Sequence, residues 1–253
     1  MDPLLRNELQ NLKVTPNPSY HKISIVVPVY NERRTIETIL EVILGAPVLG
    51  LEKEVILVDD FSKDGTREVL ETIRDPRVKV ILQSENGGKG SALHAGFRAV
   101  TGDLVIVQDA DLEYDPHEYP ILLHPFLEQK ADIVYGSRYL KNNLRQVPRF
   151  WHTFFNKLFT LLTSAITNVY MTDVQTCYKV FNRKVLEEVA WSLQSKRFGF
   201  DPEFTAKMAR GAYKIMEVPV SYYPRTRQAG KHMNLKSELE TLLPMLKYNL
   251  FKN

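Results

Sequence analysis

The sequence predicts a single α/β domain in which a mostly parallel, Rossmann-like sheet is flanked by helices. Two observations predict this class. Short apolar runs rich in Val, Ile and Leu alternate with amphipathic stretches along the first half of the chain, as in βαβ units. The composition is that of an ordinary globular protein, because the 253 residues are 44% hydrophobic and 25% charged. A chain of this length can bury a sizeable core.

The individual elements follow from the same runs. Apolar segments predict four strands, at residues 23–29, 54–58, 78–82 and 104–108. The stretches between and after them predict three helices, at about residues 34–44, 64–73 and 90–100. In the second half, aromatic and apolar residues predict an amphipathic helix over residues 150–166, and Cys177 is expected in a further strand.

The two ends of the chain are expected to lie outside the main domain, which covers residues 21–232. Residues 1–20 predict an arm without the positive head and apolar core of a signal peptide. The most apolar tract, residues 158–172, is shorter than the roughly 20 residues that span a bilayer, so we expect no membrane crossing. Residues 233–253 predict a C-terminal amphipathic helix, with apolar positions at Leu235, Leu239, Leu242, Leu246 and Leu250.

Composition argues against disulfides, cysteine-based zinc sites and nucleic-acid binding. A single cysteine cannot form an internal disulfide or a cysteine-based zinc site, which favours a reducing compartment. The isoelectric point near 8.8 is only mildly basic, so no nucleic acid is expected as a partner.

Polar residues follow all four predicted strands, at the sheet edge where α/β proteins bind ligands. Asp109 and Asp111 end the fourth strand, and two carboxylates at this spacing can hold Mg²⁺ or Mn²⁺ on a phosphate. The alternative is an acidic loop before a helix that Asp115 caps. Asp59 and Asp60 end the second strand and could accept hydrogen bonds from a base or a ribose.

The third strand is followed by the glycine-rich segment 86–91. It is neither a Walker loop, because Gln83 stands where the first glycine is required, nor a dinucleotide fingerprint, because Leu93 occupies the third glycine position. Two interpretations stay open. The segment is a tight strand-to-helix turn, or its Lys89 meets a phosphate or a base.

Two basic stretches without acidic residues lie in the second half, at residues 133–172 and 218–237. Scattered solvated side chains would explain any one of these cations, but two uninterrupted stretches suggest more than one anionic group as ligand. Their basic residues are Arg138, Lys141, Arg145, Arg149 and Lys157 in the first stretch, and Arg225, Arg227, Lys231 and Lys236 in the second.

Six motifs occur in an order and spacing that resemble a known family. They are VPVYNE (27–32), VDDFSKDGT (58–66), NGGKGSAL (86–93), DADLEYDP (109–116), YGSR (135–138) and DVQTCYKVF (173–181). From about residue 23 to residue 231, the chain resembles the family 2 glycosyltransferases with a GT-A fold. Within them it is most similar to the dolichyl-phosphate mannose synthases and other polyprenyl-phosphate glycosyltransferases. Residues 21–232 would then be the catalytic domain.

The resemblance implies a role for each matching residue. Asp109 and Asp111 would be the D-x-D pair that holds the divalent cation on the donor diphosphate. Arg138 would reach a phosphate, and Arg149 the acceptor phosphate. One departure is Glu113, where the mannose synthases usually have Gln, so the resemblance does not specify the donor sugar. The residues that would bind the nucleotide-sugar donor are Pro28, Tyr30, Glu32, Asp59, Asp60, Lys89, Asp109, Asp111, Arg138, Arg225 and Lys231.

The expected activity is inverting, metal-dependent transfer of a hexose from a nucleoside diphosphate sugar to a polyprenyl phosphate. Such an acceptor is already ionised near neutral pH and needs no strong base. The alternative is transfer to a sugar hydroxyl of a glycan, for which Glu203 is the candidate base. An acidic residue in the first turn of a helix explains Glu203 as well. A domain that binds nucleotide sugar without turnover is a further alternative, which the D-x-D pair and the basic stretches disfavour.

The expected location is the cytoplasmic face of a membrane, with peripheral attachment. The aromatic helix at residues 150–166, flanked by basic residues, could lie in the plane of the membrane surface. Packing of this helix or of the C-terminal one on the domain or on a dimer partner is the alternative. A homodimer or a separate membrane subunit is therefore among the expected partners.

Overall fold

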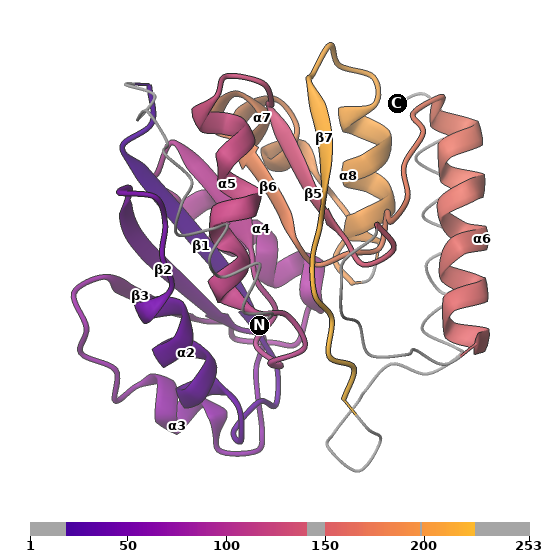
Figure 1. Ribbon diagram of the computed structural model, residues 1–253. Helices are drawn as coiled ribbons and strands as arrows, with labels where there is room; N and C mark the ends of the chain where they lie inside the picture. The colour runs from indigo at the N-terminus through magenta and orange to yellow at the C-terminus, as the bar shows by residue number, and fades with distance from the viewer. Residues whose placement is uncertain (1–18, 141–149, 198, 226–253) are drawn as a thin grey trace.

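The computed structural model describes residues 19–140, 150–197 and 199–225 (Figure 1). Within these residues a seven-stranded sheet runs in the order β3-β2-β1-β4-β6-β5-β7. β6 is antiparallel to β4 and β5, and the other neighbouring pairs are parallel, which confirms a mostly parallel sheet. The strands are β1 (Lys22–Val29), β2 (Glu52–Asp59), β3 (Val78–Leu82), β4 (Leu104–Val107), β5 (Ile133–Ser137), β6 (Lys179–Asn182) and β7 (Ile215–Pro219).

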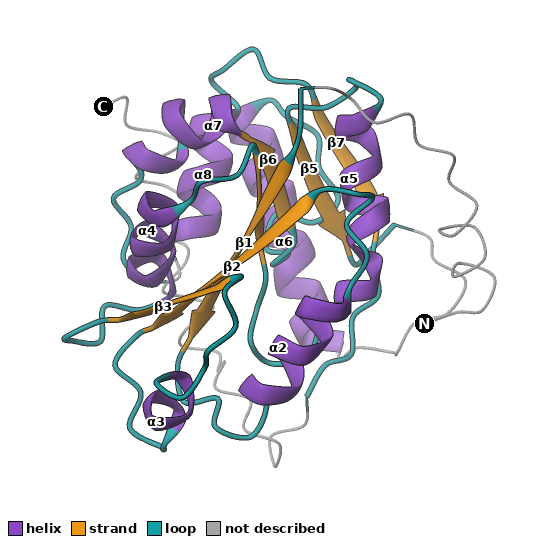
Figure 2. Ribbon diagram, turned by 90° about the vertical axis from the view of Figure 1, so that its left-hand side faces the viewer, coloured by secondary structure: helices purple, strands orange, loops and turns teal. Residues whose placement is uncertain are grey.

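Helices cover both faces of this sheet. Figure 2 shows α4, α7 and α8 on one face and α2 and α5 on the other, while α6 stands at the side of the molecule beside α8 (Figure 1). The helices are α2 (Ile36–Gly45), α3 (Thr66–Leu70), α4 (Lys89–Ala99), α5 (Tyr119–Leu127), α6 (Phe150–Thr167), α7 (Arg183–Glu188) and α8 (Phe200–Met208), with short 3₁₀ turns η1 (Pro116–Glu118) and η2 (Ala190–Ser192).

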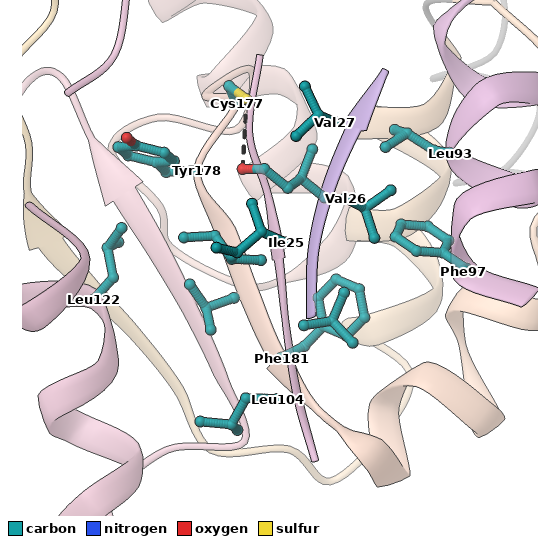
Figure 3. Packing of buried hydrophobic residues seen from close by; sticks show 14 of the residues in the cluster. Ile25, Val26, Val27, Leu93, Phe97, Leu104, Leu122, Cys177, Tyr178 and Phe181 are labelled. Carbon is teal, nitrogen blue, oxygen red and sulfur yellow. Dashed lines mark hydrogen bonds between the residues drawn. The ribbon is translucent and has the colours of Figure 1, made fainter. Parts of the chain in front are cut away.

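The core lies on both sides of β1 and β4, whose Ile, Val and Leu side chains are buried. In Figure 3, Leu93 and Phe97 of α4 lie on one side of these strands and Leu122 of α5 on the other. Gly96 lets α4 approach β1 closely, because a Cβ at this position would lie 2.4 Å from Val26 Cγ1. Continuous burial explains why these strands are unbroken apolar runs in the sequence.

The predicted elements agree with the structure, with two corrections. Helix α3 covers only Thr66–Leu70, although the pattern predicted a helix over residues 64–73. The helix begins two residues later than expected, after Gly65 (φ 92°), and Asp64 before it accepts a hydrogen bond from the Thr66 amide. Cys177 was expected in a strand but lies two residues before β6, with its Sγ 3.6 Å from the Val107 carbonyl oxygen (Figure 3).

Some expectations fall outside the described residues. These are most of the N-terminal arm, the C-terminal helix, and six residues of the two basic stretches: Lys141, Arg145, Arg149, Arg227, Lys231 and Lys236. Among the helices that the structure describes, none has the length and apolar character needed to cross a bilayer.

Candidate active site

Loops that follow β1, β2, β3 and β4 meet at the edge formed by the carboxyl ends of these strands. The first two loops are joined directly. The amide of Asn31 donates to Ser62 Oγ, the Asn31 side chain accepts from the Lys63 amide, and the Glu32 amide donates to Thr66 Oγ1. Asn31 adopts a left-handed backbone conformation (φ 54°), which turns the chain sharply after β1. The first two loops therefore form one rigid rim at the edge of the sheet.

An acidic pair at the end of β4 is the centre of this edge. Asp109 Oδ1 lies 2.7 Å from Lys89 Nζ, and Asp111 Oδ2 lies 3.4 Å from Arg225 Nη2. Both carboxylates are partly exposed, with 24% and 20% of the side-chain surface accessible. Each acid thus has one cation beside it and still faces solvent.

The two acids differ in their electrostatic surroundings. Burial, followed by the charges of Asp109 and Glu113, raises the pKa of Asp111 to about 7. For Asp109, burial is the largest single effect and raises the pKa, but the charge and hydrogen bond of Lys89 together with other neighbours bring the net pKa below its usual value. For Lys89, burial is the largest single effect and lowers the pKa, but the negative groups around it, Asp109 first among them, together raise it above its usual value. Lys89 and Asp109 therefore hold each other charged.

Arg225 reaches this edge from the segment after β7. Its guanidinium makes two hydrogen bonds to Glu32, of 2.9 and 2.7 Å, and its backbone amide donates to Glu113 Oε1 at 2.7 Å. Tyr222 donates from its hydroxyl to the other oxygen of Glu113. Among the described residues, the buried Nε of Arg225 has no hydrogen-bond partner. Arg225 thus joins the β1 and β4 loops and keeps one donor unsatisfied.

The glycine-rich segment forms a tight turn whose amide hydrogens are already used. Asp60 accepts hydrogen bonds from the amides of Gly87 and Gly88, and also from the side chain of Asn86. The amides of Gly90 and Ser91 donate to the carbonyls of residues 197 and 196. These four amides are therefore not available to cradle a phosphate, and the turn serves instead to bring the Lys89 side chain beside Asp109.

The remaining predicted donor-binding residues lie around the same edge. Pro28 is half-buried in β1, and Tyr30 is 41% exposed directly after it. Asp59 is fully buried, and its carboxylate accepts from the Ser62 amide and from Arg67 Nη1. Asp60 is buried on the glycine-rich turn, so both aspartates have partners within the protein.

Arg138 lies next to this edge and is engaged by Asp173. Its Nε and Nη2 donate to the two oxygens of Asp173 at 2.7 and 2.8 Å, and only 9% of the arginine side chain is exposed. Its guanidinium also lies 5.1 Å from the ring centroid of Tyr222. Since Tyr222 donates to Glu113, that tyrosine connects Arg138 to the loop that carries the acidic pair.

Glu203 is fully buried in the first turn of α8. Its carboxylate accepts from the amides of Gln194 and Ser195 and pairs with Lys207 at 2.9 Å. The structure does not bring this carboxylate into contact with Asp109 or Asp111.

Sequence reasoning missed a second charged pair near Lys89, formed by Lys179 of β6 and Asp201 of α8. Lys179 is fully buried, and the charge of Asp201 contributes to the raised pKa of Lys89. A signal was present, because a lysine interrupts the apolar run 177–181 and Asp201 stands two residues before Glu203. Residues two apart on a helix point in different directions, so the choice between these acids needed the structure.

A divalent cation fits the acidic pair. No cluster of three or more His, Cys, Asp or Glu side chains with metal-binding geometry occurs within the described ranges. Mg²⁺ is usually held by one or two carboxylates together with substrate phosphates, so two aspartates are the expected protein contribution. Asp109 and Asp111 would supply these oxygens, and both side chains are partly exposed.

Comparison with known proteins decides the family. The model of glycosyl transferase family 2 matches residues 24–190, which include the four loops and the acidic pair. The chain belongs to glycosyl transferase family 2.

Two curated relatives carry the names of transferases that act with lipid phosphates. A dolichol-phosphate mannosyltransferase of Pyrococcus furiosus is 30% identical over 212 residues, which are 83% of this chain and 59% of the relative. An undecaprenyl-phosphate 4-deoxy-4-formamido-L-arabinose transferase of Proteus mirabilis is 34% identical over 221 residues, 85% of this chain and 64% of the relative. The chain thus matches about three fifths of the length of each relative.

Solved structures show the fold of this family 2 member. Glucosyl-3-phosphoglycerate synthase from Mycobacterium tuberculosis, in complex with Mn²⁺, UDP and phosphoglyceric acid, superposes with a TM-score of 0.69. The alignment covers 98% of this chain and 84% of that chain at 19% sequence identity. The predicted GT-A fold is therefore confirmed.

Proposed function

We propose that this family 2 protein is an inverting, metal-dependent glycosyltransferase that moves a hexose from a nucleoside diphosphate sugar to a polyprenyl phosphate. The observation that carries the proposal is the meeting of Asp109 and Asp111 with Lys89 and Arg225 at the sheet edge. The names of the two curated relatives support the lipid phosphate as acceptor.

The donor would bind with its diphosphate at the acidic pair. Asp109 and Asp111 would hold Mg²⁺ or Mn²⁺, which when bound supplies positive charge to the leaving diphosphate. Lys89 and Arg225 would stabilise the same developing charge from fixed positions. Pro28, Tyr30 and Glu32 would line the nucleotide pocket, with Asp59 and Asp60 supporting its floor. GDP-mannose and UDP-glucose are the donor types we propose.

The acceptor phosphate would bind on the basic side of the site. A phosphate monoester is largely ionised near neutral pH, so its oxygen can attack the anomeric carbon without a strong base. In-line attack with departure of the diphosphate inverts that carbon. Arg138, held in place by Asp173, would contribute positive charge to the acceptor side, together with Arg149.

Helix α6 would bring the enzyme to the lipid. Its exposed face carries large apolar side chains and no acidic residue, which suits a helix lying in the membrane interface at the cytoplasmic face. Four aromatic rings at its start contact one another. The exposed apolar residues are Phe150, Trp151, Phe154, Phe155, Leu158, Leu161 and Leu162. Lys157, exposed on the same helix, would face the lipid headgroups.

Transfer to a sugar hydroxyl is the alternative, and it would require a carboxylate base. Glu203 was the candidate, but its oxygens are engaged by two backbone amides and Lys207, and the side chain is fully buried. We therefore favour the phosphate acceptor.

A partition assay tests the proposal. Purified protein with Mn²⁺ is incubated with radiolabelled GDP-mannose or UDP-glucose, with and without a polyprenyl phosphate, and label in the organic phase is counted. Label that requires the lipid would identify donor and acceptor together. Slow donor hydrolysis without labelled lipid would contradict the acceptor and keep the transferase, whereas no turnover of either donor would contradict both.

A further inference from the structure

We infer that Glu203 is a positioning residue, which fixes the turn at residues 194–197 and through it holds Lys89 beside Asp109. This inference rests on the proposed function, because it assigns Glu203 an effect on binding of the donor diphosphate. Glu203 would then act as a structural support for the site and not as a general base toward the acceptor.

The first step is the set of hydrogen bonds between the Glu203 carboxylate and the backbone of the turn. The Gln194 amide lies 2.9 and 3.0 Å from the two carboxylate oxygens, and the Ser195 amide lies 2.7 Å from Oε2. Lys207, one helical turn further along α8, pairs with Oε1 at 2.9 Å. A charged acceptor for two adjacent amides holds a turn more strongly than a neutral one does.

The second step is the contact on the other side of the same turn. The carbonyls of Lys196 and Arg197 accept hydrogen bonds of 2.7 and 3.2 Å from the amides of Ser91 and Gly90. These amides belong to the first turn of α4, where a helix has no carbonyl of its own to receive them. The 194–197 turn therefore caps the start of α4.

The fit between the turn and the helix leaves no spare room. A Cβ on Gly90 would lie 2.2 Å from the Ser195 carbonyl oxygen. A Cβ on Gly88, which has a left-handed φ of 86°, would lie 2.9 Å from Arg197 Cα. A small shift of the turn must therefore move the backbone on either side of Lys89.

The third step leads into the site. Lys89 is the first residue of α4, and its ammonium lies 2.7 Å from Asp109. Glu203 thus reaches Lys89 through two layers of hydrogen bonds, without itself lying at the acidic pair. Its role is to position the ammonium group of Lys89 relative to Asp109.

The test is a double-mutant cycle that measures affinity for UDP and GDP by calorimetry in the presence of Mn²⁺, together with the donor KM. Glu203→Gln keeps one acceptor oxygen and the side-chain volume, and we expect it to weaken nucleotide binding about tenfold. In a Lys89→Met background the same change should weaken binding less than about twofold, because the residue through which it acts is gone. The matched control is Lys207→Met, which leaves both amide bonds of Glu203 in place and should change affinity less than about twofold.

A second variant covers the case in which Glu203→Gln fails to fold. Gly90→Ala leaves Glu203 intact and pushes on the turn from the opposite side. It should also raise the nucleotide Kd and lose this effect in the Lys89→Met background. A Gly90→Ala protein with normal affinity would contradict the inference.

Other outcomes separate the competing explanations. If Glu203 were a general base, Glu203→Gln would lower kcat by about 10²–10⁴ with the KM unchanged, and the acid limb of the pH profile would vanish. Equal effects of Glu203→Gln with and without Lys89 would show that it does not act through that lysine. If the wild type binds neither nucleotide, the proposed function fails; if it binds and Glu203→Gln binds equally well, only this inference fails.

Discussion

At the scale of single residues, Asp111 is the acid whose surroundings point most directly to a ligand. Its pKa is raised to about 7 by burial and by two neighbouring carboxylates, and its nearest cation, Arg225, lies 3.4 Å away. A carboxylate crowded by other negative charges is stabilised by a bound divalent cation. We therefore expect a bound divalent cation to reduce the repulsion between Asp111 and the neighbouring carboxylates.

We therefore predict that Asp111→Asn lowers transfer by about 10²-fold or more, the size of effect seen when one electrostatic stabiliser of a transition state is removed. The measurement is label transfer to polyprenyl phosphate over a range of Mn²⁺ concentrations. Asp103→Asn is the matched control, because Asp103 lies just before β4, at the opposite end of the same strand. Equal activity of Asp111→Asn and wild type would remove Asp111 from the metal site.

Glu118 is a second residue with a raised pKa, away from the acidic pair. It is buried, its Oε2 accepts from the Ser221 amide at 2.9 Å, and its Oε1 has no hydrogen-bond partner in the part of the chain that the structure describes. Burial raises its pKa from 4.5 to about 7. Between these values the folded protein binds more protons than the unfolded chain, so stability falls as the pH rises through this window.

Glu118→Gln should therefore gain stability relative to wild type between pH 4.5 and pH 7.5, by up to about 3 kcal/mol. Urea unfolding at several pH values measures the difference, and the exposed Glu85→Gln serves as control. A stability difference that stays constant with pH would show that the pKa of Glu118 is the same in the folded and the unfolded protein.

Single residues also show what a sequence can and cannot predict. The aspartates at the strand ends were found because a carboxylate after a buried apolar run is conspicuous. Their partners were not, because Asp60 binds the amides of Gly87 and Gly88, and no pattern distinguishes that from binding a ribose. Hydrogen-bond partners depend on backbone positions within a few tenths of an ångström.

At the scale of elements, α6 is the helix whose exposed face has no structural explanation within the domain. Trp151 is 64% exposed and Phe154 is 46% exposed, in a helix without an acidic residue in its first turn. We predict that the double variant Trp151→Ser/Phe154→Ser binds vesicles containing anionic lipid at least tenfold more weakly, because it removes two aromatic anchors.

Vesicle sedimentation measures this effect, with Tyr170→Ser as the control. Tyr170 is 87% exposed but lies beyond the other end of α6. Unchanged vesicle binding by the double variant, with an unchanged fold by circular dichroism, would argue for packing of α6 on another protein instead.

Helices and strands were predicted where the spacing of apolar residues is regular. The strands of the first half are continuous apolar runs because both faces of the sheet are covered, and such runs are plain in a sequence. α3 was predicted too long because both of its ends are set by local backbone geometry: Gly65 with a φ of 92° precedes it, and residues 71 and 72 form a turn after it. The antiparallel direction of β6 was not predicted. It depends on the pairing of β6 with β4 and with β5, and both strands lie far from β6 in the chain.

At the scale of the whole molecule, the site is assembled from distant parts of the chain. Arg225 and Glu32 are 193 residues apart, and Lys89 and Asp109 belong to different βα units. The resemblance to a family placed Arg225 near the site, but its bond to Glu32 joins the segment after β7 to the loop after β1, two strands that are not neighbours in the sheet. Pairing of this kind is a property of the topology and cannot be derived from local pattern.

This assembly predicts that donor nucleotide stabilises the whole domain. A ligand that contacts loops after β1, β3, β4 and β7 binds only the folded chain, so it raises stability by mass action. At a nucleotide concentration of about 100 Kd the gain is roughly 2.7 kcal/mol, which shifts the Tm of a protein this size by roughly 5–10 °C. Thermal unfolding with UDP or GDP in the presence of Mn²⁺ measures the shift.

The controls follow from the residues of the proposed metal site. Because the described residues offer two aspartates and no larger ligand cluster, Mn²⁺ alone should shift the Tm much less than Mn²⁺ with nucleotide. EDTA should abolish most of the nucleotide shift, and Asp111→Asn should do the same without EDTA. A full shift in EDTA would show that Lys89 and Arg225 bind the diphosphate without a metal, and metal dependence would then be wrong. A shift with one nucleotide and not the other would identify the base that the pocket accepts, since the two ligands share the same diphosphate.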